Sequence, residues 1–224
     1  MTLTKIIEKH ANQLNLRPNQ LLNKLIEGSY QYVVTGQLHN SFRSYQSAFN
    51  EFFAELFEEV MENPFRDILG ETMGELNALD KKRSQHFTPI EIADFVAKVT
   101  GQNANTVSDI TCGSGAMLLA AMKQHCETGE GALSIHANDL DELLCKATTV
   151  QIELNYLAMQ FINPSVSVNY IVVNHDALLD YKRMHTICSD TNIVGCSDRN
   201  KITDPTIKKW LKTQLIQQDF QTAA

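Results

Sequence analysis

The stretch Asp109-Ile110-Thr111-Cys112-Gly113-Ser114-Gly115 lies between two segments of opposite character. The residues from Thr106 to Ile110 predict a strand, and the run from Ala116 to Lys123 predicts a helix. The two glycines of the turn allow the backbone to fold tightly and to come close to a ligand. The free N–H groups at the start of the helix favour a carboxylate or a phosphate. This stretch therefore predicts a strand–turn–helix unit that binds a ligand.

The residues downstream continue the alternation of strands and helices. Leu133–Ala137 and Val166–Val173 are typical of strands, and a long helix is predicted between them, starting near Asp141. Asn192–Val194 predicts a short fourth strand. This order is typical of a parallel sheet covered by helices. We therefore expect an α/β domain over residues 81–224, with a partial Rossmann-like sheet and helices on both faces.

Residues 1–80 predict a helical region that precedes this domain. Apolar residues recur at helical spacing on either side of a break at Arg17-Pro18. A later helix has a phenylalanine-rich face, which we interpret as a core surface rather than a cofactor site. The helix–break–helix near residues 3–27 has the outline of a DNA-reading unit, but its few basic residues favour a packing role.

The composition is typical of a globular protein. Of 224 residues, 43% are hydrophobic, yet no apolar run approaches the roughly 18 residues that a membrane-spanning helix needs. The N-terminus lacks the apolar core of a signal peptide. The five cysteines include no Cys-x-x-Cys pair, so we expect neither a metal site nor disulfides. Together these features predict a protein of the reducing cytoplasm with no membrane attachment.

The charge of the chain argues against strong DNA binding by its own surface. The formal net charge is −7, and Lys81-Lys82-Arg83 is the only basic cluster in the sequence. Proteins that bind DNA tightly are usually basic. If nucleic acid is the substrate, we expect weak binding by this chain or binding through a partner chain.

Three acids follow the three longer predicted strands: Asp109, Asp139 and Asp176. The carboxyl ends of parallel strands share one edge of a sheet, where such sheets bind ligands. Asp109 suits the ammonium group of an amino-acid moiety. Asp139, 24 positions after Gly115, is either an acceptor for ribose hydroxyls or a turn residue. Asp176 suits the exocyclic amine of adenine, whereas Asp141 is interpreted as a helix N-cap.

A helix start is predicted upstream at Thr88-Pro89. Thr88 as N-cap, Pro89 at the first helical position and Glu91 three residues after Thr88 form a capping box. The cap explains these three residues structurally. It leaves the aromatic Phe87 beside them unexplained.

Together these motifs resemble those of the adenine-N6 DNA methyltransferases, closest to the modification subunits of type I restriction-modification systems. Gln85-His86-Phe87-Thr88-Pro89 is similar to the family's Q-[FY]-[FY]-T-P element. The stretch from Asp109 to Gly115 is similar to its D-P-x-C-G-S-G element, with Thr111 in the place where the family often has proline. Residues 63–71 look like the lead-in helix of the family. The resemblance covers about residues 63–180.

The resemblance implies S-adenosylmethionine as the cofactor and assigns the residues that bind it. Those at its methionine end are Gln85, Phe87, Thr88 and Pro89. Those of the loop are Asp109, Thr111, Cys112, Gly113, Ser114 and Gly115. Those at its adenosine end are Asp139 on the ribose, Leu140 on the adenine ring, Asp176 on the adenine amine, and Ala177.

The catalytic element of the family is missing. That element is Asn or Asp followed by Pro-Pro and Phe or Tyr, and this sequence contains no such tetrapeptide. In the family it accepts a hydrogen bond from the target amine and stacks on the flipped base. The residues after the fourth predicted strand, Gly195 to Arg199, offer neither proline nor aromatic, and Asp204-Pro205 is interpreted as a helix start. We therefore expect no catalytic residue, and a domain truncated after its fourth strand.

Two classes of function remain open. In the first, the chain is part of an adenine methyltransferase and a partner chain supplies the base pocket and the DNA-recognition surface. In the second, it is a non-catalytic regulator, decoy or partner subunit of a restriction-modification system that binds S-adenosylmethionine. Methylation of an amine outside DNA is a third possibility.

The sheet of the family also gives an expectation for the fourth strand. There it lies between the first strand and a fifth, so we expect Asn192–Val194 beside Thr106–Ile110. Its outer edge then needs a cover. Either a helix from Thr206 to Gln218, anchored by Trp210, folds back over it, or a second chain covers it in a homodimer or a complex with a restriction-modification subunit.

Overall fold

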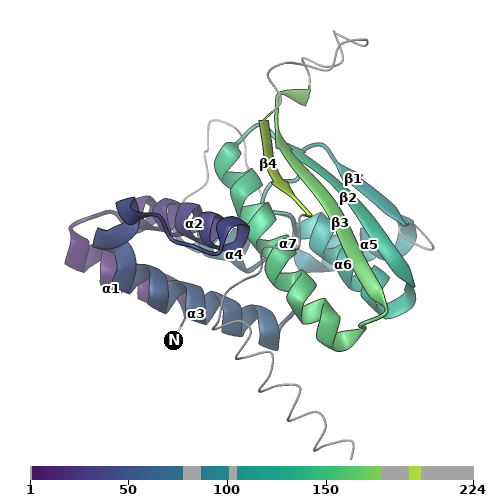
Figure 1. Ribbon diagram of the computed structural model, residues 1–224, viewed down its shortest axis with the longest axis horizontal. Helices are drawn as coiled ribbons and strands as arrows, with labels where there is room; N and C mark the ends of the chain where they lie inside the picture. The colour runs from purple at the N-terminus through teal and green to yellow at the C-terminus, as the bar shows by residue number, and fades with distance from the viewer. Residues whose placement is uncertain (1, 78–86, 101–104, 178–191, 198–224) are drawn as a thin grey trace, which may run out of the picture.

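The computed structural model describes residues 2–77, 87–100, 105–177 and 192–197 (Figure 1). A group of helices lies beside a four-stranded sheet. No helix in these described ranges is long and apolar enough to cross a membrane. The predicted helix from Thr206 to Gln218, Gln85 and the basic cluster 81–83 lie outside the described residues.

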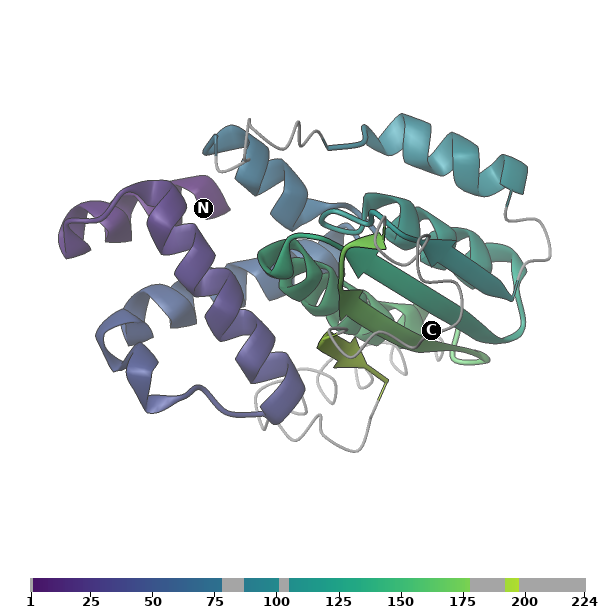
Figure 2. The ribbon, with the colours of Figure 1, turned by 90° about the horizontal axis from the view of Figure 1, so that it is seen from above.

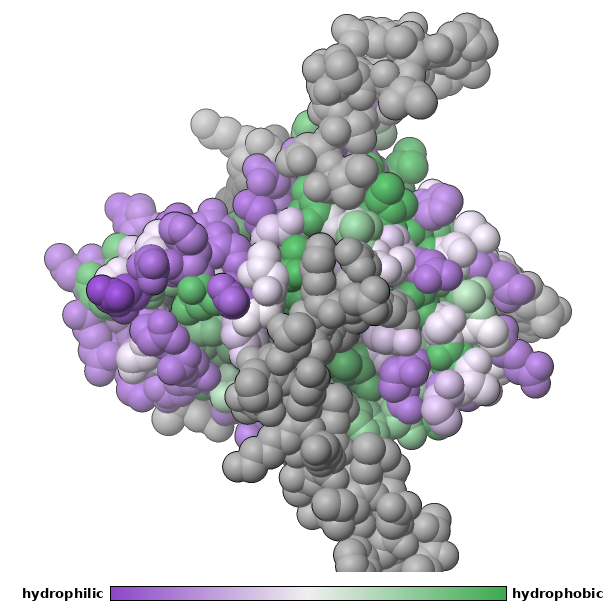
Figure 3. Space-filling model, in the orientation of Figure 1, coloured by the Kyte–Doolittle hydropathy of each residue, from purple (hydrophilic) through white to green (hydrophobic). Residues whose placement is uncertain are grey.

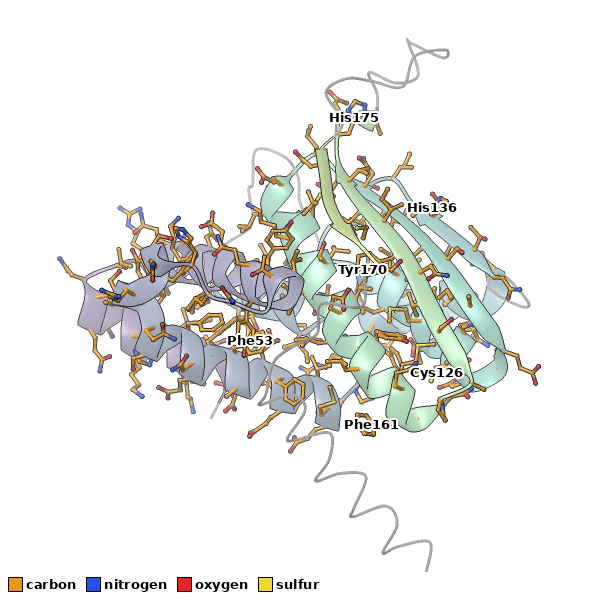
Figure 4. All side chains as sticks on the ribbon, in the orientation of Figure 1. Phe53, Cys126, His136, Phe161, Tyr170 and His175 are labelled. Atoms are coloured by element: carbon orange, nitrogen blue, oxygen red, sulfur yellow. The ribbon has the colours of Figure 1, made fainter. Side chains whose placement is uncertain are left out.

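The N-terminal region is helical, as predicted. Its elements are α1 (Leu3–Leu14), α2 (Pro18–Thr35), the 3₁₀ helix η1 (Asn40–Tyr45), α3 (Gln46–Glu62) and α4 (Ile68–Glu75). Asn15 ends α1 in the left-handed conformation and Pro18 opens α2, so the predicted break is confirmed. The phenylalanine-rich face of α3 is buried in the core of this bundle, where Phe53 is seen in Figure 4. The exposed side of the bundle in Figure 3 is mostly hydrophilic.

Helix α7 (Glu142–Ile162) joins the bundle to the sheet, because it belongs to the core of both. Leu144, Val150 and Leu154 pack with the N-terminal helices. Ile152 and Met159, on its other side, pack with the strands. Burial on two sides explains why α7 is apolar around most of its circumference.

The remaining elements form the α/β part and confirm the expected fold class. They are α5 (Ile90–Thr100), β1 (Thr106–Asp109), α6 (Ala116–Thr128), β2 (Gly131–Asp139), β3 (Val166–Asn174) and β4 (Asn192–Cys196). The strand order is β1-β2-β3-β4, and the first three strands are parallel. The elements β1, α6, β2, α7 and β3 therefore form in the order that the alternating pattern of the sequence predicts.

The described helices cover one face of the sheet, whereas we expected helices on both. Residues of α6 and α7 share a core with Leu133 and Ile135 of β2 and with Val168 of β3. Among the alternate strand positions, His136 and Asn169 are exposed, and Ser134 and Ser167 are half-buried. A sheet covered on both faces needs apolar residues at every strand position. The polar alternate residues explain why these helices gather on one side.

The fourth strand is not where we expected it. β4 pairs with β3, in the antiparallel direction, and not with β1. An antiparallel neighbour needs no crossover helix, whereas a parallel strand beside β1 needs a connection of a dozen or more residues that usually contains a helix. β1 is consequently an edge strand among the described residues.

Candidate cofactor-binding site

The parallel strands bring the predicted acids to one edge of the sheet. Asp109 lies opposite Ala137 in the β1–β2 register, and Asp139 lies opposite Asn174 in the β2–β3 register. Asp176 follows two residues after the end of β3. All three acids therefore sit at the carboxyl edge, as predicted from the sequence.

The glycine loop crosses this edge and leads into α6. Gly113 and Gly115 have φ values of +57° and +102°, a region that favours glycine. The Gly113 N–H donates to Asp139 Oδ2 at 2.9 Å, and the Thr111 N–H donates to Asp109 Oδ1 at 3.0 Å. A Cβ atom placed on Gly113 would meet nothing within 4 Å. The loop is thus held from below by strand-end carboxylates and is open on its outer side.

Asp139 has a structural task in the turn after β2. Its Oδ1 accepts the Asp141 N–H at 2.8 Å, while Oδ2 accepts the Gly113 N–H. Each carboxylate oxygen has two lone pairs, so Asp139 retains acceptor capacity for ribose hydroxyls. The ribose role stays a prediction. Asp141 is the N-cap of α7, as predicted, since its Oδ1 accepts the Leu143 N–H at 3.0 Å.

The strand-end acids repel one another. Burial raises the pKa of Asp109, and the negative charge of Asp139 raises it further. A hydrogen bond from the Thr111 N–H acts in the opposite direction. A cation bound beside Asp109 would relieve this repulsion, and the ammonium group of an amino acid is such a cation.

Phe87 and Thr88, predicted for the methionine end, do lie beside the loop. They line one cavity of about 580 Å³ with Asp109, Thr111 and Gly113, together with Cys112 and Ser114. Phe87 also packs against the bundle core. Pro89 lies immediately before α5, and its carbonyl oxygen accepts the Ala93 N–H at 3.1 Å.

The residues predicted for the adenosine end form a separate group. Asp139, Leu140, Asp176 and Ala177 do not line the 580 Å³ cavity. Leu140 is 58% exposed, as expected of a side chain available to an aromatic ring. The cavity extends in the other direction, along β1 to His125 and Leu133. A cofactor that touches both groups must therefore cross the glycine loop.

The described residues offer no metal site and no disulfide. No cluster of three or more His, Cys, Asp or Glu side chains suited to a metal ion occurs among them. Burial raises the pKa of the Cys145 thiol to about 12, and it also raises the pKa of Cys112. These two thiols are consequently protonated at neutral pH and poor nucleophiles.

Residues 62–163 match the family model of the N-6 DNA methylases. Over these residues the chain is similar to that family. The match contains α4, the start of α5, the glycine loop and Asp139, which are the elements that build the site. A search of curated proteins and a search of solved structures found no match to the chain.

Two asparagines at this edge of the sheet were missed in the sequence. Asn138 Nδ2 donates to the carbonyl oxygens of Ile110 at 2.9 Å and His175 at 3.1 Å, so it ties the ends of β1 and β3 to β2. Asn174 Nδ2 donates to the carbonyl oxygens of Asp139 and Leu140, both at 3.0 Å. His175 is seen just beyond β3 in Figure 4. The available signal was an asparagine at the end of two successive predicted strands.

The segment that matches the family model also has an apolar surface beside the cavity. Ile92, Phe95 and Val99 of α5 are exposed, and Phe95 is 65% exposed. Ala93 and Ala97, on the opposite side of the helix, pack against Ala120 of α6. Figure 2 shows α5 at the margin of the molecule. Residues Thr106–Asp109 of β1 line the same cavity as Val96 and Thr100 of α5.

Proposed function

We propose that this chain binds S-adenosylmethionine and serves methyl transfer to the N6 atom of adenine in DNA, as part of a restriction-modification system. The observation that carries the proposal is the glycine loop with an acid at the end of each parallel strand. The loop, Asp109 and Asp139 lie within residues 62–163, which match the N-6 DNA methylase family model. The cofactor supplies a methyl group activated by its positive sulfur. The chain supplies the binding site.

The residues fit this cofactor in three places. The open outer side of Gly113 leaves room for a ligand to approach the loop backbone. Asp109, with its raised pKa, gains from the ammonium group of the methionine moiety. Asp139 accepts from the ribose hydroxyls, and the exposed Leu140 packs on the adenine ring. Phe87, Thr88 and Pro89 border the methionine end, and we include Gln85 there by the resemblance to the family.

We propose further that methyl transfer needs a partner chain and that this chain acts like the modification subunit of a type I system, which its motifs resemble. The sequence has no tetrapeptide to hold a flipped adenine, and its net charge of −7 disfavours tight DNA binding. The edge of β1 and the exposed apolar side chains of α5 support a partner at that side, because proteins seldom leave such edges bare. Residues 1–80 then act as a helical support for the cofactor domain in residues 81–224.

A non-catalytic regulator or decoy is the second candidate, and the missing tetrapeptide favours it. Such a protein binds the cofactor and takes part in a restriction-modification system without transferring a methyl group. Both candidates place the protein in the cytoplasm, where DNA and S-adenosylmethionine are found.

A titration followed by a transfer assay tests both candidates. Calorimetry with S-adenosylmethionine should give binding to the isolated chain and none to Gly113→Val, because a β-branched residue does not tolerate a φ of +57°. Labelled methyl transfer to DNA should be absent with the isolated chain and present after addition of the cognate restriction-modification subunits. Absence of transfer in the complex favours the regulator. Transfer by the isolated chain, lost in Gly113→Val, contradicts the need for a partner.

DNA binding by the isolated chain should be weak and should fall steeply with salt. The reason is that the few basic residues supply only non-specific contacts to phosphates. Fluorescence anisotropy with a labelled duplex at two salt concentrations measures this. Tight, sequence-selective binding at physiological salt would show that the N-terminal helices read DNA.

A further inference from the structure

A buried carboxylate outside the predicted cofactor site contacts the glycine loop from behind. Asp67 is 8% exposed and caps α4, where its Oδ1 accepts the Gly70 N–H at 2.9 Å. Its Oδ2 accepts the hydroxyl proton of Ser114 at 2.6 Å. Ser114 stands between the two loop glycines and is 2% exposed. One side chain therefore joins the N-terminal helices to the loop.

Gln151 of α7 completes this contact. Its Nε2 donates to Asp67 Oδ1 and to the Ser114 carbonyl oxygen, both at 2.7 Å. Its Oε1 accepts the Leu69 N–H at 3.1 Å. Asp67, Ser114 and Gln151 thus form one network, which we call the loop clamp, with members from α4, the loop and α7.

Gly70 of α4 packs closely against the loop clamp. A Cβ atom on Gly70 would lie 2.2 Å from Asp67 Oδ2 and 2.5 Å from Ser114 Oγ. Burial raises the pKa of Asp67, and hydrogen bonds from Ser114, Gln151 and Gly70 act against this effect. A buried carboxylate is tolerated only when it is hydrogen-bonded in this way. The site therefore retains a costly group that a stable core does not require.

Through Ser114, the loop clamp can fix the conformation of the glycine loop. Gly113 and Gly115 have no side chains, so within Gly113-Ser114-Gly115 only the side chain of Ser114 can make a fixing contact. Asp139 holds the loop at the Gly113 N–H, on the side of the strands, and Asp67 holds it at Ser114, on the side of α4. A glycine turn fixed in advance loses less conformational entropy when a ligand binds.

We propose that Asp67 is a positioning residue for the cofactor loop, acting through the hydroxyl of Ser114. The proposal rests on the proposed binding of S-adenosylmethionine and adds a role for the N-terminal helices: they set the loop in its binding conformation. This role does not require Asp67 to contact the cofactor.

The test compares four variants and one matched control by calorimetry with S-adenosylmethionine. The variants are Asp67→Ala, Ser114→Ala, the double variant and Asp67→Asn. In Asp67→Asn the side-chain carbonyl still accepts from Gly70 and Gln151, while the amide group donates to the Ser114 oxygen. The control is Glu153→Gln. It alters a second buried carboxyl, which lies on α7 and accepts the hydroxyl of Tyr170 on β3.

We expect Asp67→Ala and Ser114→Ala each to weaken cofactor binding about tenfold, the loss typical of one hydrogen bond to a charged group. The double variant should lose no more than either single variant, because both remove the same contact. Asp67→Asn and Glu153→Gln should stay within about threefold of the natural chain, since neither releases Ser114. A role in folding alone would not produce rescue by Asp67→Asn together with non-additive losses.

Three results would overturn the proposal: an Asp67→Ala loss no larger than that of Glu153→Gln, losses that multiply in the double variant, or an Asp67→Asn loss equal to that of Asp67→Ala. If Asp67→Ala does not fold, Ser114→Ala and Asp67→Asn carry the same test, with loss expected only in Ser114→Ala.

Hydrogen exchange of the cofactor-free chain separates this proposal from the proposed function. Peptides that cover residues 112–118 should exchange faster in Asp67→Ala and Ser114→Ala than in the natural chain. Their exchange rates should be unchanged in Asp67→Asn and Glu153→Gln. If the natural chain does not bind S-adenosylmethionine but shows this pattern, the proposed function fails and the loop clamp stands. Unchanged exchange in Asp67→Ala and Ser114→Ala overturns the loop clamp, whatever the cofactor result.

Discussion

At the β4 edge of the sheet, the hydroxyl of Tyr30 on α2 donates to the carbonyl oxygen of Val194, whereas at the β1 edge no described element pairs with Thr106–Asp109. Val194 is buried beside α7 and the N-terminal helices. At the β1 edge, the neighbouring helix α5 leaves Phe95 and Val99 exposed. One edge is covered by residues of this chain, and the other is left available among the described residues.

The two helices beside these edges sharpen the contrast. Both α5 and α7 are apolar over much of their surface, yet α7 buries two sides and α5 buries little more than Ala93 and Ala97. Apolar content alone therefore does not predict burial. Whether a helix is buried depends on its neighbours, and no described element covers the side of α5 that carries Phe95 and Val99.

The largest expected effect is on stability, at the covered side. Phe52→Ala in the bundle core should lower the free energy of unfolding by about 3–5 kcal/mol, because Phe52 is fully buried and its loss leaves a cavity. Phe95→Ala, the matched change at the open side, should alter it by less than about 0.5 kcal/mol. Urea denaturation measures both. A loss above about 1 kcal/mol in Phe95→Ala would mean that α5 is covered after all.

The next largest effect is on cofactor affinity, at the strand ends between the β1 and β4 edges. If cofactor binding does not need the β1 edge, the isolated chain should bind S-adenosylmethionine. Asp139→Ala should then weaken that binding by about 1–3 kcal/mol, because two ribose hydroxyls lose their acceptor. Calorimetry measures the change. Asp141→Ala serves as the control, because it removes a helix cap and should lower stability without lowering affinity. Equal affinity of Asp139→Ala and the natural chain would remove the ribose role.

A smaller effect is expected at the β4 edge. Tyr30→Phe should lower the free energy of unfolding by about 0.5–1.5 kcal/mol, because the carbonyl oxygen of Val194 loses its donor. Urea denaturation of this variant beside Tyr45→Phe, a tyrosine of the bundle that is not at the sheet, isolates the edge contact. Equal stability of Tyr30→Phe and the natural chain would remove the distinction between the two edges.

The smallest effect is the pH dependence contributed by Asp109 at the end of β1. Its pKa is raised in the folded chain, so the folded chain binds this proton more tightly than the unfolded chain does. Its contribution to stability therefore falls as the pH rises above 3.8, the ordinary value for Asp, and levels off above the raised pKa. Unfolding measured from pH 3.5 to 7 should show this decline in the natural chain and less of it in Asp109→Asn. A steeper decline in the variant would contradict the direction of the shift.

Local features of the sequence determined most of the elements and the outline of the site. The helices of residues 1–75, the glycine loop, the N-cap at Asp141 and the acids at the strand ends were all predictable, because each depends on periodicity, glycine or capping within a few residues. The polar residues at alternate positions of β2 and β3 also carried the information that one face of the sheet is uncovered by apolar packing, although we expected helices on both faces.

Only the tertiary structure decided what depends on distant partners. The position of β4 beside β3 was not predictable, since a strand of five residues pairs equally well in local terms with either edge. The exposure of Phe95 and the burial of Asp67 are likewise set by neighbours: α5 has no described neighbour on its outer side, and Asp67 meets Ser114 across 47 positions of chain. Periodicity specifies which face of an element is apolar, and long-range packing determines what that face meets.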